Sequence, residues 1–365
     1  MQDACCFGNR VLYPFEGGRE SPPLLVSDWR CLCQLPTDPF SMAHITSDIS
    51  AAADALKRGE PVAFATETVY GLGGVALWPE TVARIFEVKG RPTFDPLIVH
   101  LPELSHVERY VTHIPPVARA LADRFWPGPL TLVLPKVPEI PDLVTSGLGS
   151  VAVRVPAHPM ALELLRQTGL PVAAPSANLF GRVSPTTAQH VADQLGDRID
   201  WILDGGPCAV GVESTVLAVP DSGRPTLLRP GGVTVEEIED LIGPVLTPGH
   251  QAQDSEAQPQ VAPGQLPQHY APTTPIVIAP DGRHEEREHA SRVGALAFQS
   301  CPDADRFAAI EILSPSGNLR EAAADLFAAM RRLDALGLDL IIAQPFPESG
   351  LGRAINDRLR RAAHR

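Results

Sequence analysis

The stretch FATETVYGLGG, Phe64 to Gly74, decides how the chain should fold. It begins inside the apolar run PVAFAT (residues 61–66), which predicts a short buried strand, and a helical pattern follows at about residues 81–90. The stretch carries two threonines, a glutamate, a tyrosine and three glycines. Polar and small residues at a strand end indicate a ligand site, because ligands of α/β proteins usually bind there.

Helices and strands alternate on both sides of this stretch. The segment SDISAAADALKRGE (residues 47–60) predicts a helix, with Ser47 or Asp48 as the N-cap and Gly59 as the end. Further on, STVLAVP and PTLLRPG predict an antiparallel pair joined around residues 221–223. Together these patterns predict an α+β domain with a mixed, twisted sheet.

Composition divides the chain into four parts. Residues 1–41 lack sustained periodicity and are expected to form a poorly ordered leader. Residues 42–245 form the first domain, and residues 246–275, rich in Gln, Pro, Ala and Gly, form an interdomain linker. Residues 276–365 predict a small Rossmann-like α/β domain with helices at about 284–292, 319–336 and 353–364. It has no GxGxxG loop, so no dinucleotide is expected there.

Bulk properties exclude several classes of protein. A net charge of −13 over 365 residues argues against gripping nucleic acid as the main task. No window approaches the roughly 18 apolar residues of a membrane helix, and the N-terminus does not resemble a signal peptide, so a cytoplasmic protein is expected. Four of the six cysteines lie within the first 33 residues without zinc-site spacing, so no metal site is predicted.

Isolated cations lie beside the predicted strand ends. Lys89 and Arg91 come where the helix at 81–90 breaks, and two cations on a rigid turn suit a polyphosphate. The alternative is a helix C-terminus decorated with cations that favour the dipole. In either case we expect both side chains to lie at a helix end and outside the core.

A third cation and a polar loop complete this pattern. Arg154 lies in an otherwise apolar strand and needs an anionic partner, which is either a structural carboxylate or the carboxylate of a substrate. Ser176 and Asn178 follow a predicted buried strand and offer a hydroxyl and an amide to a ligand. Ordinary turn chemistry explains these two residues equally well.

Seven motifs carry a family resemblance when they are taken in order. The segments are TETVYGLG, KGRP…PLIVH, WPGPLTLVL, VAVRVPAHP, APSAN, GVESTV and LLRPG. The chain resembles the YrdC/Sua5 family, and APGQLPQHYAP with the region after it resembles the longer Sua5 branch. The resemblance covers about residues 45–365.

The resemblance implies a nucleotidyltransferase, an L-threonylcarbamoyladenylate synthase. Such enzymes combine L-threonine, bicarbonate or CO2, and ATP into threonylcarbamoyl-AMP and pyrophosphate. The product serves N6-threonylcarbamoylation of the tRNA adenosine next to the anticodon. The implied cofactors and partners are ATP as a substrate, Mg2+, and the downstream tRNA threonylcarbamoyl-transfer machinery, with no stable nucleic-acid complex and no membrane.

The resemblance also assigns residues, position by position. The L-threonine contacts fall on Thr66, Ile98, Arg154, Ala174 and Ser214. The ATP contacts fall on Lys89, Thr93, Ser150, Ser176, Asn178, Ser184, Arg229 and Tyr270, and Lys89 and Arg91 are the implied catalytic residues. In TETVYGLG the glycines would permit close backbone approach.

Three positions depart from the family pattern: Ala65, Asp95 and Gln268. Ala65 should only loosen a strand end. Asp95 adds negative charge near the phosphate cations, so its side chain must point away, pair with one of them or help to hold Mg2+. Gln268 weakens any argument that the linker brings a cation to the site.

The linker contains APGQLPQHYAP, Ala262 to Pro272, with an aromatic pair out of character with its surroundings. We expect this segment to form a lid with Tyr270 against ATP. A solvated spacer with an incidental His-Tyr pair is the alternative.

Two rival functions remain open from the sequence. The first is an RNA-binding or ribosome-associated module, which the acidic net charge disfavours. The second is an adenylate-forming enzyme that uses another amino acid, such as serine.

Overall fold

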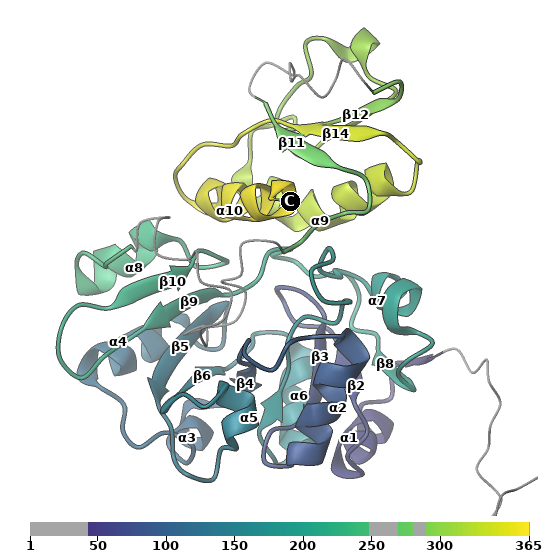
Figure 1. Ribbon diagram of the computed structural model, residues 1–365. Coiled ribbons are helices and arrows are strands. Elements are labelled where there is room, and N and C mark those ends of the chain that lie inside the picture. Colours follow the sequence, from purple (N-terminus) through teal and green to yellow (C-terminus); the bar gives the residue numbers. More distant parts are fainter. Residues whose placement is uncertain (1–42, 248–268, 280–289, 365) are drawn as a thin grey trace, which may run out of the picture. The chain divides into compact units, whose positions relative to one another are not determined.

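The computed structural model describes residues 43–247, 269–279 and 290–364 (Figure 1). The predicted leader lies outside these residues. Most of the predicted linker, including Gln268, and most of the helix expected at 284–292 also lie outside them.

Ten strands of the described residues form one mixed sheet. Their order is β1-β8-β2-β3-β7-β4-β6-β5-β9-β10, and the sheet contains both parallel and antiparallel neighbours. The predicted antiparallel pair after residue 214 is present as β9 and β10. The strands are β1 (His44–Thr46), β2 (Val62–Phe64), β3 (Gly71–Val75), β4 (Ile98–His100), β5 (Leu130–Pro135), β6 (Ser150–Arg154), β7 (Val172–Ala173), β8 (Trp201–Leu203), β9 (Thr215–Ala218) and β10 (Thr226–Arg229).

Local signals in the sequence fix the ends of several helices. Asp48 caps the first helix by accepting a hydrogen bond from the Ala51 amide (3.1 Å), and the second ends at Gly90, whose φ of 61° is left-handed. The helices of this domain are α1 (Ile49–Lys57), α2 (Pro79–Lys89), α3 (Leu104–Val107), α4 (Pro116–Phe125), α5 (Asp142–Thr145), α6 (Pro159–Thr168), α7 (Ala188–Leu195) and α8 (Val235–Ile242).

The glycines of the opening stretch form a strand, β3, antiparallel to β2. A Cβ at Gly73 would lie 2.6 Å from the Phe64 ring, and one at Gly74 would lie 2.5 Å from the Thr81 side chain. The close approach at these two positions is therefore to the core and not to a ligand. Gly71, the first of the three, lines the pocket described below.

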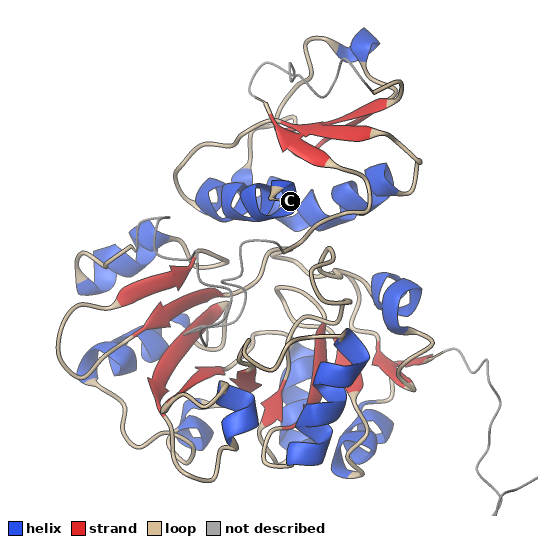
Figure 2. Cartoon of the chain, in the orientation of Figure 1, coloured by secondary structure: helices blue, strands red, loops and turns tan. Residues whose placement is uncertain are grey.

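The second sheet is parallel, with the strand order β11-β14-β12-β13. Figure 2 shows two helices on one face of it, α9 (Leu319–Asp334) and α10 (Leu351–Ala363). Its strands are β11 (Ile276–Ile278), β12 (Val293–Ala297), β13 (Ala309–Ile312) and β14 (Leu340–Ala343), with a 3-10 turn, η3, at Ala304–Arg306. The helices expected at 319–336 and 353–364 and the predicted α/β class are confirmed.

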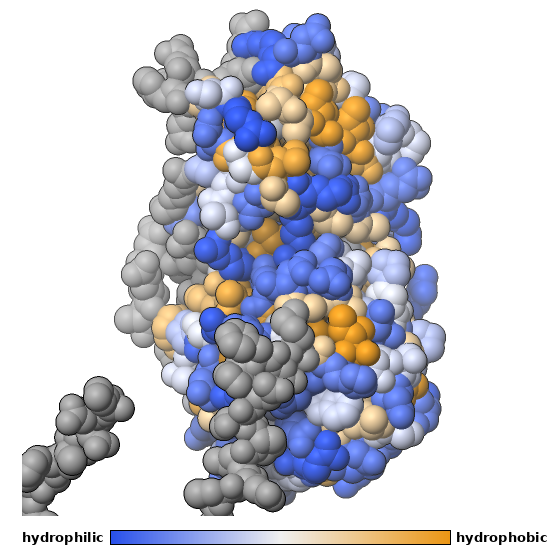
Figure 3. Space-filling model, turned by 90° about the vertical axis from the view of Figure 1, so that its right-hand side faces the viewer, coloured by the Kyte–Doolittle hydropathy of each residue, from blue (hydrophilic) through white to orange (hydrophobic). Residues whose placement is uncertain are grey.

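Apolar side chains from the strands and helices of both sheets pack into buried clusters. One core cluster includes Val69 and Val212 of the first domain together with Tyr270 and Phe327. On the face drawn in Figure 3, the apolar patches are small and hydrophilic residues interrupt them. No helix of the described residues is long and apolar enough to cross a membrane.

Candidate active site

A pocket opens where β4 and β6 end and where the loop after β2 returns to β3. These elements bring together residues that lie far apart in the sequence. The lining residues are Thr66, Thr68, Val69, Gly71, Arg91, Ile98, His100, Arg154, Ala174, Pro175, Ser176, Glu213, Ser214, Arg229, His269 and Tyr270.

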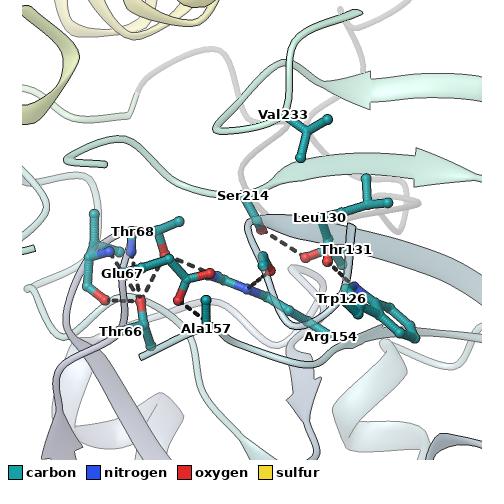
Figure 4. A network of polar contacts seen from close by, with 12 residues as sticks. Thr66, Glu67, Thr68, Trp126, Leu130, Thr131, Arg154, Ala157, Ser214 and Val233 are labelled. Carbon is teal, nitrogen blue, oxygen red and sulfur yellow. Dashed lines mark hydrogen bonds and ion pairs between the residues drawn. The ribbon is translucent and has the colours of Figure 1, made fainter. Parts of the chain in front are cut away.

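Arg154, the last residue of β6, is held on three sides (Figure 4). Its Nη2 donates to Glu67 Oε1 (2.6 Å), its Nη1 to Thr68 Oγ1 (3.0 Å) and its Nε to the Gly128 carbonyl (3.2 Å). The structure thus supplies a structural carboxylate, one of the two partners expected for Arg154. These bonds use three of five N–H donors, so a buried cation with remaining donor capacity lines the pocket.

The loop that carries Glu67 is itself fixed by hydrogen bonds. Thr66 Oγ1 donates to the Val69 carbonyl (2.6 Å) and lies 2.8 Å from Thr68 Oγ1, while Glu67 Oε2 accepts from the Ala157 amide (3.0 Å). Both carboxylate oxygens of Glu67 are therefore occupied. As Figure 4 shows, this loop and Arg154 form one connected polar network.

Lys89 and Arg91 are buried, with exposed fractions of 2% and 7%. The expectation that both cations lie outside the core is wrong, because α2 packs its last turn against the loop after β7. Lys89 Nζ donates to the carbonyls of Ser176 and Asn178, both at 2.6 Å. Burial, with Arg91 nearby, holds the Lys89 pKa well below its usual value.

Asp95 pairs with Arg91, which was one of its three expected arrangements. Arg91 Nη2 lies 2.9 Å from Asp95 Oδ2, and Arg91 Nε donates to the Asp95 carbonyl (3.1 Å). Burial lowers the Arg91 pKa, and the Asp95 charge opposes that shift. The carboxylate thus compensates a buried cation that lines the pocket.

Arg229 and Ser214 line the pocket together and are joined to each other by hydrogen bonds. Arg229 Nη2 donates to the Ser214 carbonyl (3.0 Å) and lies 3.3 Å from Ser214 Oγ, which in turn lies 2.7 Å from Thr131 Oγ1. The pairing of β9 with β10 shifts register between Leu227 and Arg229, and such an irregularity re-aims a side chain.

Glu213 is an acidic side chain in this pocket, and no motif reasoning singled it out. Its Oε1 accepts from Ser184 Oγ (2.6 Å), and its Oε2 accepts from Nε of Arg358 in α10 (2.9 Å). The carboxylate therefore joins a residue expected to bind ATP to the last helix of the chain.

The aromatic pair His269 and Tyr270 also lines the pocket. Tyr270 is 1% exposed, and its phenol oxygen has no hydrogen-bond partner among the described residues. Its ring stacks on Phe327 of α9 with 5.6 Å between centroids, and the Arg358 guanidinium lies 5.3 Å from its centroid. Burial raises the Tyr270 pKa.

The predicted site residues divide into two groups by location. Most of them line the pocket: Thr66, Arg91, Ile98, Arg154, Ala174, Ser176, Ser214, Arg229 and Tyr270. The others lie outside the lining: Lys89, Thr93, Ser150, Asn178 and Ser184. Lys89, Asn178 and Ser184 reach lining residues or their loops through hydrogen bonds, whereas the Thr93 carbonyl accepts from Ser146 Oγ (2.9 Å) and Ser150 begins β6.

Sequence reasoning missed the carboxylates and one histidine. Glu67 and Glu213 lie inside the motifs TETVYGLG and GVEST, but the site predictions in these motifs rested on hydroxyl residues and cations and not on the glutamates. His100, at the end of β4, lines the pocket, and burial together with Arg154 lowers its pKa to about 3. An acidic residue directly before a hydroxyl residue, Thr68 or Ser214, was the signal available for the two glutamates.

The acidic side chains do not fit a metal site built by the protein. Among the described residues, no group of three or more His, Cys, Asp or Glu side chains is placed to hold a metal ion. Glu213 is already bonded to Ser184 and Arg358, and Asp95 is paired with Arg91.

Two protein-family models and several known proteins match this chain. A family model named Sua5_yciO_yrdC and described as "Telomere recombination" matches residues 54–231, and one described as "Threonylcarbamoyl-AMP synthase, C-terminal domain" matches residues 233–364. A Bacillus subtilis threonylcarbamoyl-AMP synthase is 45% identical over 324 residues, which is 86% of this chain and 92% of that protein. The chain belongs to the Sua5 family. The resemblance seen in the seven motifs is confirmed.

Further Sua5 relatives extend the comparison to solved structures. The threonylcarbamoyl-AMP synthase of Schizosaccharomyces pombe is 35% identical over 87% of this chain and 88% of its own length. The crystal structure of Pyrococcus abyssi Sua5 complexed with L-threonine has a TM-score of 0.79 at 42% identity, covering 86% of this chain and 94% of that one. A His-Tyr double-alanine variant of the same archaeal protein also gives a TM-score of 0.79, at 40% identity, covering 88% and 96%.

Proposed function

We propose that this chain is a threonylcarbamoyl-AMP synthase, a nucleotidyltransferase that makes threonylcarbamoyl-AMP and pyrophosphate from L-threonine, bicarbonate or CO2, and ATP. The product would supply N6-threonylcarbamoyladenosine formation next to the tRNA anticodon, through downstream transfer machinery in the cytoplasm. The observation that carries the proposal is Arg154, a buried and pre-oriented cation in a pocket of a Sua5 family chain.

The threonine subsite is assigned to one end of the pocket. Arg154 would bind the substrate carboxylate with its remaining N–H donors, since charge-assisted pairs with carboxylates are strong. Ile98 and Ala174 offer an apolar surface for the threonine methyl group. Thr66 and Ser214 supply hydroxyls, which favours a small polar amino acid.

The ATP subsite is assigned to the cationic remainder of the pocket. Arg91 and Arg229 would neutralise phosphate charge, and Tyr270 and Ser176 line the same space. Lys89, which lies outside the pocket lining, would act indirectly by fixing the loop carbonyls of Ser176 and Asn178. Thr93, Ser150 and Ser184 complete the proposed set of ATP contacts.

The chemistry asks little covalent help from the protein. The threonine amine adds to CO2 and loses a proton to give a carbamate, and a carbamate oxygen attacks the α-phosphate of ATP as pyrophosphate leaves. Positioning and charge stabilisation dominate such a reaction. Mg2+ would enter with the phosphates of ATP, because the pocket's acidic side chains do not fit a protein-built site.

The segment from His269 to Pro275 is proposed to cover the reaction. Its Tyr270 lines the pocket, and the Ala271 amide donates to the Gly181 carbonyl (2.8 Å), which ties the segment to the first domain. Coverage would exclude water that hydrolyses a mixed anhydride.

The decisive experiment measures pyrophosphate release with each substrate omitted in turn, alongside mass-spectrometric detection of threonylcarbamoyl-AMP. Release should require both threonine and bicarbonate. Pyrophosphate release with serine but not with threonine would favour an adenylate-forming enzyme that uses another amino acid. RNA binding without any release would favour the RNA-binding reading.

A further inference from the structure

Arg358 in α10 is the largest side chain that is fully buried among the described residues, with none of its surface exposed. A buried guanidinium is costly unless it is paired and hydrogen-bonded. Its Nη1 donates to the Pro230 carbonyl (2.6 Å) and to Asp357 Oδ2 (2.9 Å), and its Nε donates to Glu213 Oε2 (2.9 Å). Several contacts therefore hold this one buried cation in place.

Glu213 and Tyr270, whose ring lies beside the Arg358 guanidinium, both line the pocket, although Arg358 does not. The Tyr270 ring contacts both the Arg358 guanidinium (5.3 Å from its centroid) and the Phe327 ring (5.6 Å between centroids), and these two contacts restrict the plane of the ring. Tyr270 also has a φ of 65°, a left-handed conformation that a bulky residue keeps only where its surroundings hold it. Arg358 and Phe327 are such surroundings.

Glu213 gives Arg358 a second effect on the pocket. A carboxylate beside the proposed phosphate subsite would repel a triphosphate, and a buried cation 2.9 Å away offsets that repulsion. The same ion pair fixes Glu213 Oε1 on Ser184 Oγ. Loss of Arg358 would therefore disturb one wall of the pocket and free the ring of Tyr270.

We propose that Arg358 is a positioning residue for the nucleotide subsite, acting through Tyr270 and Glu213, so that α10 completes the site from the second domain. The inference rests on the proposed function for the identity of the nucleotide. The phenol oxygen of Tyr270, buried and without a partner among the described residues, is the group that Arg358 would present to ATP.

The test compares Arg358→Lys with Arg353→Lys. Arg353 also lies on α10 and also pairs with a glutamate of the first domain, Glu236 (3.0 Å), but it is part-exposed and lies outside the pocket. We expect Arg358→Lys to raise the ATP KM and the ATP Kd from calorimetry at least tenfold and the threonine KM less than twofold. Arg353→Lys should leave all three within twofold of wild type.

A double-mutant cycle checks that Arg358 acts through Tyr270. In a Tyr270→Ala background, Arg358→Lys should change the ATP Kd much less than in wild type, because the ring it positions is absent. If Arg358→Lys fails to fold, Arg358→Met with Glu213→Gln removes both buried charges and takes its place. That double variant should also show the selective loss for ATP.

Three results would overturn the inference: an unchanged ATP Kd, equal losses for ATP and threonine, or full additivity with Tyr270→Ala. The proposed function fails separately, if wild type binds ATP but releases no pyrophosphate with threonine and bicarbonate. Because ATP Kd is measured without turnover, the two failures are distinguishable.

Discussion

Two buried glutamate–arginine pairs flank the pocket, and they are used in opposite ways. In the first, Arg154 lines the pocket and Glu67, outside the lining, orients it (2.6 Å). In the second, Glu213 lines the pocket and Arg358, outside the lining, orients it (2.9 Å). The role of such a pair therefore depends on which of its two partners faces the ligand.

The pairs also differ in what joins them. The first connects a loop and a strand of the same domain, whereas the second connects that domain to the last helix of the chain. Removing one partner of a buried pair costs about 3–5 kcal/mol, because a charge is left uncompensated. Stability must therefore be measured beside kinetics in every variant.

The largest effect is expected for Arg154→Ala. The variant loses the partner of the threonine carboxylate, so kcat/KM for threonine should fall by the equivalent of roughly 2–5 kcal/mol in activation free energy. The ATP KM should change much less. Steady-state pyrophosphate release with each substrate varied gives both constants. A folded variant with unchanged threonine dependence would remove Arg154 from the threonine subsite.

A second prediction sets Glu67→Gln against Glu213→Gln. Glu67→Gln leaves the buried Arg154 without its carboxylate and should lower the free energy of unfolding by about 3 kcal/mol. Glu213→Gln should lower it less, because Asp357 still pairs with Arg358 (2.9 Å). Threonine should recover part of this loss only in Glu67→Gln, where its carboxylate can replace the missing anion beside Arg154. Thermal melts with and without threonine measure the difference, and equal recovery in both variants would contradict the contrast between the pairs.

A third prediction concerns His100, which lies beside the first pair. Its pKa is about 3 in the folded chain, against an ordinary value of 6.5, so the unfolded chain binds a proton that the folded chain refuses. Stability should fall as pH falls from 6.5 towards 3, by up to about 1.4 kcal/mol per pH unit from this residue.

The variant His100→Gln isolates this contribution. Denaturant unfolding at several pH values between 3 and 6.5 should give a shallower loss than in wild type. Wild type keeps other titrating groups in this window, including His190 with a pKa lowered to about 4, so the difference between the two slopes is the informative quantity. Parallel slopes would show that His100 does not contribute.

The smallest effect is expected for Arg353→Met. This arginine pairs with Glu236 at a part-exposed site, and such pairs contribute less than about 1 kcal/mol. Chemical denaturation should give a loss within that range, and added salt should reduce it. A loss as large as that of Glu213→Gln would mean that exposed and buried contacts of α10 are equivalent.

The sequence by itself determined the secondary structure and much of the candidate site. Alternation of apolar runs, caps such as Asp48 and breaks such as Gly90 are local signals, and they placed the strands and helices well. A lone Arg154 in an apolar strand implied an anion. The seven motifs of the sequence by themselves indicated the family.

Tertiary structure decided the partners and the burial. The pairs Glu67–Arg154 and Glu213–Arg358 join residues 87 and 145 positions apart, and no local pattern specifies such a meeting. The burial of Lys89 and the packing of Gly73 on Phe64 likewise depend on what lies opposite each residue in the folded chain. Local chemistry sets what a side chain can do, whereas long-range packing sets which charge compensates it and which group faces the ligand.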